Sequence, residues 1–213
     1  MNDLVDLILV EPVTDVDEKI RFKHSNVACE LLTSDLDLIS DALLEPQLLN
    51  KLYSFLESEK QLNPLLASFF SKTMSLLSVK RTAPLLRFLQ TKDNFVQLIL
   101  HHIETSAIMD FLLKLVTVDN EDMRSEIVQV SCSCHFSLLT VSRLQWLSSK
   151  ELVPQVVAIF ARTEEPDKVA NAAQFLCDVV KAVREQQSLL QEKATPNALL
   201  DEIESYVFLL VTD

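Results

Sequence analysis

Apolar residues recur at helical spacing along most of the 213-residue chain, and the clearest stretch begins at Asn63. Asn63 is a favoured N-cap residue and Pro64 suits the first helical position, so a helix is predicted to start there. Apolar and polar residues then alternate with a period of about 3.6, which is typical of an amphipathic helix. The predicted inward residues are Leu65, Leu66, Phe69, Phe70, Met74 and Leu77, and the predicted outward residues are Ser68, Ser71, Lys72 and Ser75.

The same pattern predicts helices on both sides of this one. Residues 16–33 carry apolar residues at mostly helical offsets, after acidic residues suited to a helix N-terminus. The predicted inward residues are Val16, Ile20, Val27, Leu31 and Leu32. Further helices are predicted at residues 47–56, 82–89, 93–102, 105–116 and 166–191, and a last one restarts at Thr195-Pro196. In the helix at 166–191, the predicted buried residues are Val169, Ala172, Ala173, Leu176, Val179, Val180 and Val183.

The longest predicted helices begin near residues 16, 63, 104 and 166. The first two intervals are about 47 and 41 residues, which is the period of armadillo and HEAT-type repeats. The third interval is roughly 20 residues longer than this period, and β-branched residues and serines replace leucine there. We therefore expect an all-α fold, an α-solenoid of armadillo/HEAT-like helical repeats. Repeats are expected at 1–120 and 148–213, with an insertion at 121–147.

Composition narrows the function classes. The chain contains no glycine, so it lacks the residue that phosphate-binding loops and dinucleotide fingerprints need. The formal net charge of −12 repels nucleic-acid phosphates and anionic lipid surfaces. No apolar run approaches the roughly 18 residues that cross a bilayer. We expect no nucleic-acid partner, no membrane insertion, reduced cysteines and a cytoplasmic location, with the nucleus as a further compartment.

Two clusters invite a chemical interpretation. Cys132, Cys134 and His135 are close in sequence, but a structural zinc site usually takes four ligands with wider spacing, so a small-residue insert is the favoured interpretation. His101 and His102 are adjacent, and on a helix their side chains point about 100° apart, so one is expected to be buried. No activated serine or cysteine is evident near them. We expect no catalytic residue, no metal site and no cofactor.

Six segments carry a resemblance to a known family: Asp17–Arg21, Cys29–Asp35, Leu52–Leu56, Leu62–Lys72, Thr105–Asp110 and Asn171–Cys177. They resemble the SAPS family, the regulatory subunits of protein phosphatase 6 and their yeast counterpart. The resemblance covers residues 4–118 well and resumes at about Lys150, whereas residues 121–146 fit nothing associated with the family. Glu104 stands where glycine is expected, which indicates a local difference in the turn.

The resemblance implies a non-catalytic regulatory and scaffolding subunit that binds the catalytic subunit of a type 2A-like serine/threonine phosphatase and helps to select substrates. Ankyrin-repeat or other adaptor proteins are further implied partners. On the polar faces of the long helices, Lys72, Asp110 and Lys114 are candidate partner contacts. The alternatives are a generic helical-repeat adaptor unrelated to phosphatases and, less favoured, an enzyme with a helical fold.

Family members resemble longer proteins, so the chain is expected to be a truncated product. Its last predicted helix ends in the apolar run Tyr206–Val211 with no further helix to cover it. Since solenoids need polar terminal caps, we expect self-association through that end.

Overall fold

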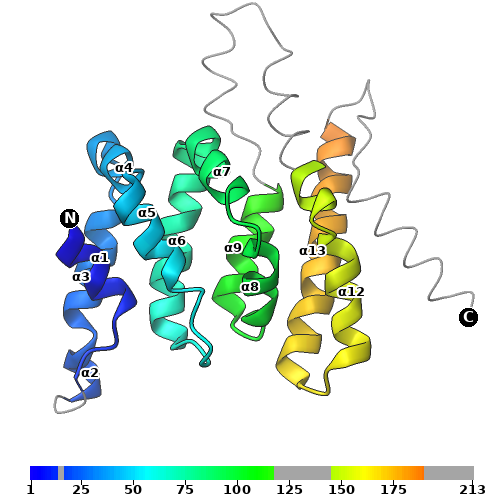
Figure 1. Ribbon diagram of the computed structural model, residues 1–213, viewed down its shortest axis with the longest axis horizontal. Coiled ribbons are helices and arrows are strands. Elements are labelled where there is room, and N and C mark those ends of the chain that lie inside the picture. Colours follow the sequence, from blue (N-terminus) through cyan, green and yellow to red (C-terminus); the bar gives the residue numbers. More distant parts are fainter. Residues whose placement is uncertain (14–16, 118–144, 190–213) are drawn as a thin grey trace, which may run out of the picture. The chain divides into compact units, whose positions relative to one another are not determined.

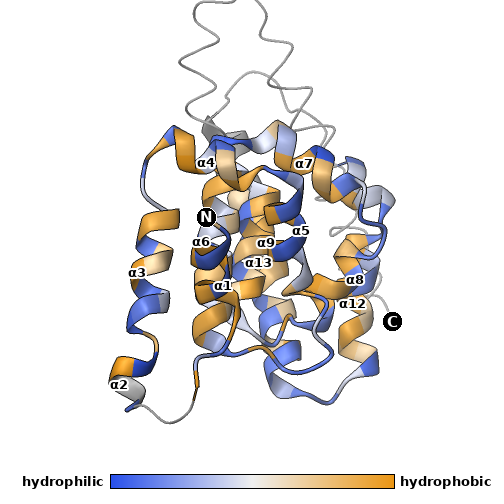
Figure 2. Cartoon of the chain, turned by 60° about the vertical axis from the view of Figure 1, so that its left-hand side comes forward, coloured by the Kyte–Doolittle hydropathy of each residue, from blue (hydrophilic) through white to orange (hydrophobic). Residues whose placement is uncertain are grey.

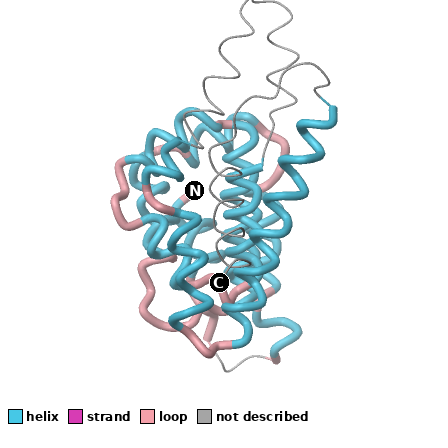
Figure 3. Tube along the Cα trace, turned by 90° about the vertical axis from the view of Figure 1, so that its right-hand side faces the viewer, coloured by secondary structure: helices cyan, strands magenta, loops and turns pink. Residues whose placement is uncertain are grey.

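The computed structural model describes residues 1–13, 17–117 and 145–189, and all regular structure among them is helical. Figure 3 shows helices and loops in this part of the chain and no strand. The expected all-α class is therefore confirmed for the described residues. The chain divides into two compact units, Met1–Phe111 and Leu112–Asp213.

The first unit is built from short helices around one longer helix, α6 (Figure 1). Helix α1 packs against α3, α5 and α6, and α6 also packs against α3 and α7. The last helix, α9, begins in this unit and continues into the second. The bounds are α1 Asn2–Leu9, α2 Glu18–Arg21, α3 Lys23–Leu32, α4 Asp37–Leu43, α5 Pro46–Ser54, α6 Pro64–Lys80, α7 Thr82–Gln90, α8 Phe95–His101 and α9 Ser106–Thr117.

Helix α6 forms the centre of the first unit, with ten of its 17 residues buried. Phe70 is fully buried and its ring contacts two others. The centre of the Phe55 ring lies 5.2 Å from the centre of the Phe70 ring. The centre of the Phe111 ring lies 5.9 Å from it, and these two rings are arranged edge to face. Such pairs add to the free energy gained by burying apolar surface. This aromatic cluster joins α6 to α9 and to the residues that follow α5.

The predicted start of α6 is confirmed. The Asn63 side-chain oxygen accepts hydrogen bonds from the backbone N–H groups of Leu65 at 3.0 Å and Leu66 at 3.3 Å. Pro64 occupies the first helical position, where its missing N–H leaves no helical bond unmade. The cap therefore satisfies two backbone donors that the helix itself leaves without partners.

Replacing the cap should weaken the first unit. Asn63→Ala removes the acceptor for two N–H groups and should lower the free energy of unfolding by about 1 kcal/mol. Urea denaturation followed by circular dichroism measures this loss. Asn63→Asp keeps a capping oxygen, so it should lose much less; equal losses from both variants would show that the cap contributes nothing.

The expected single helix at 16–33 is wrong in two respects. The described part divides into α2 and α3, separated at Phe22. Of the predicted inward residues, Leu32 is buried, whereas Ile20, Val27 and Leu31 are exposed. Helix α3 buries Ser25, Ala28 and Cys29 together with Leu32. Buried residues at these offsets lie on one face, and three of the four have small side chains. That face packs against α1 and α6, and a larger side chain there would keep these helices apart.

The prediction of the polar face of α6 is also partly wrong. Ser71 and Ser75 are buried, whereas Lys72 is exposed as expected. Helices pack on more than one side of α6, so its small polar residues enter the interior along with its apolar ones. Leu65, expected inward, is 41% exposed in the first turn. Ala173 in α13, also expected inward, is exposed, while Phe175 is buried.

Side-chain bonds in the first unit join segments at a nearly constant separation. Several bonds between distant residues span 40 to 46 positions. In most of the ion pairs an acidic residue contacts a basic residue roughly one repeat length further on. The separation agrees with the predicted period, whereas the armadillo/HEAT solenoid itself stays a prediction. The joined residues are Asp6 and Lys51, Asp35 and Lys80, Asp37 and Arg81, Asp41 and Arg81, Asn50 and Lys92, Tyr53 and Asn94, and Leu56 and His102.

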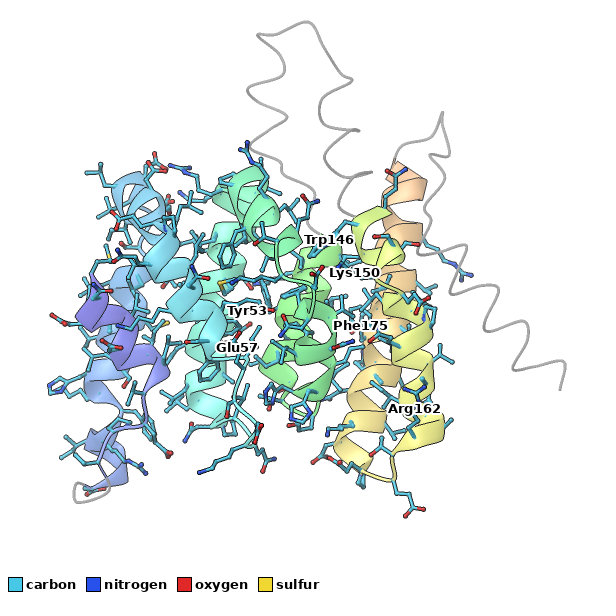
Figure 4. The ribbon with its side chains drawn as sticks, viewed as in Figure 1. Tyr53, Glu57, Trp146, Lys150, Arg162 and Phe175 are labelled. Atoms are coloured by element: carbon cyan, nitrogen blue, oxygen red, sulfur yellow. The ribbon has the colours of Figure 1, made fainter. Side chains whose placement is uncertain are left out.

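The described part of the second unit contains residues 112–117 of α9, a helical stretch at 145–149, α12 (Leu152–Arg162) and α13 (Pro166–Leu189). Helices α12 and α13 pack against each other and bury Val153, Val156, Phe175 and Val179. Figure 4 labels Phe175 on α13 and Arg162 in the last turn of α12. The start of α13 at Pro166 confirms the prediction from the sequence.

The described turns form without glycine, which the sequence lacks. Among the described residues, Glu151 before α12 has the one positive φ, 55°. Glu104, which replaces an expected glycine, does not need that conformation. The interpretation of residues 121–147 as an insertion and the expected exposure of Tyr206–Val211 fall largely or wholly outside the described residues.

Candidate functional site

The three candidate contact residues are exposed on two long helices. Lys72 lies on α6, while Asp110 and Lys114 lie one turn apart on α9. Residues four apart share one face of a helix, so Asp110 and Lys114 point in a similar direction. Within the described residues none of the three forms a salt bridge. Their charged groups are therefore accessible to a partner.

A groove lies between α3 and the first half of α6. Its volume is about 750 Å³. Val27 and Leu65 line it and are 46% and 41% exposed, although both are large apolar residues. Figure 2 shows hydrophobic residues interspersed with hydrophilic ones along α3. The full lining is Phe22, Lys23, Asn26, Val27, Asn63, Pro64, Leu65 and Phe69.

Lys23 is the charged residue among those that line the groove. Lys23 lines it and makes no salt bridge within the described residues, while Glu11 nearby is engaged by Arg21 and Asn63. The first turns of α3 and α6 contain no acidic residue, and no side chain caps α3. Lys72 is close enough to lower the pKa of the Cys29 thiol, although burial has the larger effect and raises this pKa. The positive charge of Lys23 thus lies beside apolar surface in a chain whose formal net charge is −12.

Tyr53 marks a second polar cluster, which is structural. Its hydroxyl donates a 2.8 Å hydrogen bond to the Asn94 side chain, and the Lys92 ammonium lies 4.8 Å from the ring centre. Burial raises the pKa of Tyr53 to about 12, and the carboxylate of Glu57 adds to the effect. Figure 4 labels Tyr53 and Glu57 next to each other in the first unit. A phenol this weakly acidic stays protonated and holds α5 against the start of α8.

The two histidines differ as expected, since His102 is fully buried and His101 is exposed. His102 donates through Nε2 to the Leu56 carbonyl oxygen at 3.1 Å, because that oxygen can only accept. Its Nδ1 lies 3.9 Å from a carboxylate oxygen of Glu104. Burial lowers the pKa of His102, the neighbouring His101 lowers it further, and Glu104 opposes both. A buried, neutral imidazole of this kind connects two segments of the fold.

The described residues offer no cluster of metal ligands. No group of three or more His, Cys, Asp or Glu side chains there could hold a metal ion. Cys29 and Cys177 are free thiols. The cluster Cys132, Cys134 and His135 lies outside the described residues. None of the described helices combines the length and hydrophobicity needed to cross a bilayer.

Sequence reasoning missed the α3–α6 groove. Val27 and Leu65 fit helical apolar stripes, so both were predicted to be buried. The one signal in the sequence is the width of the apolar stripe on 23–32, where Val27, Ala28, Leu31 and Leu32 cannot all face the same neighbour. Which part of that stripe stays exposed depends on packing between helices, which the pattern of one helix does not determine.

In the part of the chain that the structure describes, these features define an all-helical protein with exposed charges outside any salt bridge and an open apolar groove. The chain belongs to the SAPS family, because the family model described as SIT4 phosphatase-associated protein matches residues 73–209. The resemblance noted in the sequence is thereby confirmed. No solved structure matches this chain.

Curated relatives support the same family. The chain is 43% identical over 207 residues to serine/threonine-protein phosphatase 6 regulatory subunit 2 of Mus musculus. It is 41% identical over 206 residues to regulatory subunit 3 of Gallus gallus, and 40% identical over 206 residues to regulatory subunit 1 of Homo sapiens. Each match covers 96% of this chain but only 21% or 22% of the relative. The chain thus spans about a fifth of the length of these relatives.

The family match runs across the segment interpreted as an insertion. An aligned range of this kind does not distinguish inserted residues from equivalent ones, so the boundaries 1–120, 121–147 and 148–213 stay a prediction.

Proposed function

We propose that this chain acts as a non-catalytic regulatory and scaffolding module that binds the catalytic subunit of a type 2A-like serine/threonine phosphatase, phosphatase 6, and helps to select its substrates. The observation that carries the proposal is identity of 40% or more, over 96% of the chain, to relatives named as regulatory subunits of that phosphatase. The helical surface supports it, since stacked helices present side chains in fixed positions to a partner.

The contribution of such a module is positioning. A surface that holds a phosphatase and a second protein together raises their effective concentration without taking part in the reaction. The buried imidazole of His102, with its lowered pKa, and the protonated phenol of Tyr53 are consistent with structural rather than catalytic roles. We propose that the chain itself has no enzymatic activity.

The direct test is binding of the purified chain to purified phosphatase 6 catalytic subunit, measured by biolayer interferometry. The catalytic subunit of phosphatase 2A serves as the comparison. Saturable binding to the first supports the proposal. No binding to the first, with the chain shown to be folded by circular dichroism, contradicts it.

We propose Lys72, Asp110 and Lys114 as contacts for the phosphatase, because all three are exposed and lack salt bridges within the described residues. Reversing a charge in an interface typically replaces an attraction by a repulsion. The combination Lys72→Glu, Asp110→Lys and Lys114→Glu should weaken binding at least about tenfold, that is by about 1.4 kcal/mol.

Lys60 and Glu59 provide the matched control for these substitutions. Both are exposed in the loop before α6. Lys60→Glu with Glu59→Lys should leave phosphatase binding unchanged. Equal affinity of the triple variant and the unmodified chain would remove the three residues from the interface.

A generic adaptor role remains the second candidate, and the α3–α6 groove favours it, because exposed apolar surface of this kind can serve partners other than a phosphatase. Adaptors with ankyrin repeats or other folds are proposed as such partners. Recovery of adaptors without phosphatase in affinity purification would favour this role.

We also propose a cytoplasmic location that extends to the nucleus. The free thiols of Cys29 and Cys177 fit the reducing conditions of these compartments. Imaging of the tagged chain tests the location directly.

A further inference from the structure

The groove between α3 and α6 has the dimensions of a short peptide site. Along α3 its lining runs from Phe22 to Val27, and along α6 from Asn63 to Phe69. At 1.5 Å per residue, each side is about 9 Å long, or roughly two helical turns. A segment of two to three turns would therefore cover the lining.

The floor of the groove favours an apolar occupant. Val27 and Leu65 keep 46% and 41% of their surface exposed, and Pro64 and the partly exposed Phe22 border them. Covering this surface removes apolar area from water, which stabilises the complex. The polar lining residues are already engaged, since Asn26 contacts Glu30 and Asn63 contacts Glu11 and caps α6. An apolar occupant would therefore leave their hydrogen bonds in place.

The charged groups around the α3–α6 groove determine which kind of apolar segment can bind there. Lys23 lines the groove without a salt bridge inside the described chain, and the first turns of both helices lack acidic residues. The Arg21 guanidinium lies 5.2 Å from the ring centre of Phe22. It also forms a salt bridge with Glu11, which partly neutralises its charge. A carboxylate placed beside Lys23 and the start of α3 would thus meet a positive charge that forms no salt bridge with the described residues, and a helix N-terminus. A basic segment would meet repulsion at the same place.

We propose that the α3–α6 groove docks a short amphipathic segment of a partner protein, in which leucine-like side chains cover Val27 and Leu65 and a carboxylate pairs with Lys23. The segment binds as an apolar face laid into a groove, with the acidic residue setting its orientation. This site goes beyond the proposed phosphatase contacts, since Asp110 and Lys114 lie on α9 and Lys72, although on α6, is not among the lining residues. The groove thereby gives the module a docking point for a second protein.

The test uses the whole chain and three labelled synthetic peptides of about 12 residues, a length that spans the groove. The first carries leucines at helical spacing and two flanking glutamates. The second replaces the glutamates with lysines, and the third replaces the leucines with serines. Fluorescence anisotropy should show saturable binding of the first peptide and at least about tenfold weaker binding of the other two. Added salt should weaken the first peptide's binding.

Two variants connect this binding to the groove. Val27→Ser with Leu65→Ser should weaken the first peptide at least about tenfold, and Lys23→Gln should weaken it severalfold and reduce its salt dependence. Leu38→Ser is the matched control, because Leu38 is 84% exposed and lies outside the lining. This variant should bind the first peptide with unchanged affinity. All substituted positions are exposed, and circular dichroism confirms that each variant is folded.

Several outcomes would overturn the proposal. The first is no binding of the leucine–glutamate peptide, and the second is equal binding of the lysine version. A third is unchanged affinity in the Val27→Ser, Leu65→Ser variant. Self-association of the chain that this variant abolishes would assign the groove to a second copy instead. Lys23, Val27 and Leu65 are separate from the proposed phosphatase contacts, so loss of peptide binding with intact phosphatase binding distinguishes the two proposals.

Discussion

Phe70→Ala should lower the free energy of unfolding of the first unit by about 3–5 kcal/mol, which is close to the cost of emptying a fully enclosed aromatic site. Phe70 is completely buried in α6, and both Phe55 and Phe111 lose a ring partner when it is truncated. The surrounding helices cannot close the space completely, so a cavity remains and adds to the loss of apolar burial. A loss of this size approaches the whole stability of many small domains.

The measurement must distinguish the two units. The single tryptophan of the chain is Trp146, which lies in the second unit, so its fluorescence does not report on Phe70. Hydrogen exchange of amides in α6 follows the first unit directly. Leu38→Ala, at a position 84% exposed, should change stability by less than about 0.5 kcal/mol. Similar exchange rates in both variants would show that α6 is not the centre of this unit.

Acidification should destabilise the first unit through His102. Burial lowers the pKa of His102 in the folded state below its ordinary value of 6.5, so the unfolded chain takes up the proton more readily. The contribution of the neutral imidazole to the free energy of unfolding is present in full above pH 6.5. It is lost as the pH falls from there through the lowered pKa of the folded state. Thermal unfolding of the first unit between pH 7.5 and pH 5 should show this decline. His101 and Glu104 are the titratable groups that modulate it.

Two variants identify the group responsible. His102→Gln keeps an N–H donor for the Leu56 carbonyl oxygen but takes up no proton, so it should flatten the decline while retaining most of the stability at pH 7.5. His102→Ala leaves that oxygen without its partner and should cost about 2–3 kcal/mol. His101→Gln removes only the smaller of the two effects that lower the pKa of His102, so it should reduce the decline without abolishing it. An unchanged decline in His102→Gln would assign the acid sensitivity to another group.

Local sequence patterns predicted the elements well where the signal lies within one helix. The Asn63-Pro64 start of α6 and the Pro166 start of α13 follow from capping and proline geometry, which need no information from distant residues. Burial of Phe70, Met74 and Leu77 follows from the helical period for the same reason.

Burial that depends on several neighbours was not predictable in this way. Ser71 and Ser75 look like surface residues, yet both are enclosed because α6 has helices on more than one side. Val27 and Leu65 look like core residues, yet both border the open groove. Lys72, Asp110 and Lys114 were correctly placed at the surface, since long charged side chains are rarely buried without a partner. Their role as contacts stays a proposal, because exposure alone does not identify a partner.

The spacing of the side-chain bonds has a consequence for synthesis on the ribosome. Asp6, Asn50, Tyr53 and Leu56 each bond to a residue only 41 to 46 positions further along. Chains whose native contacts are close in sequence fold fast, because little loop entropy is lost in forming them. Each newly emerged stretch can therefore dock onto the one made just before it, and the nascent polypeptide gains structure stepwise, without waiting for its C-terminus to be translated.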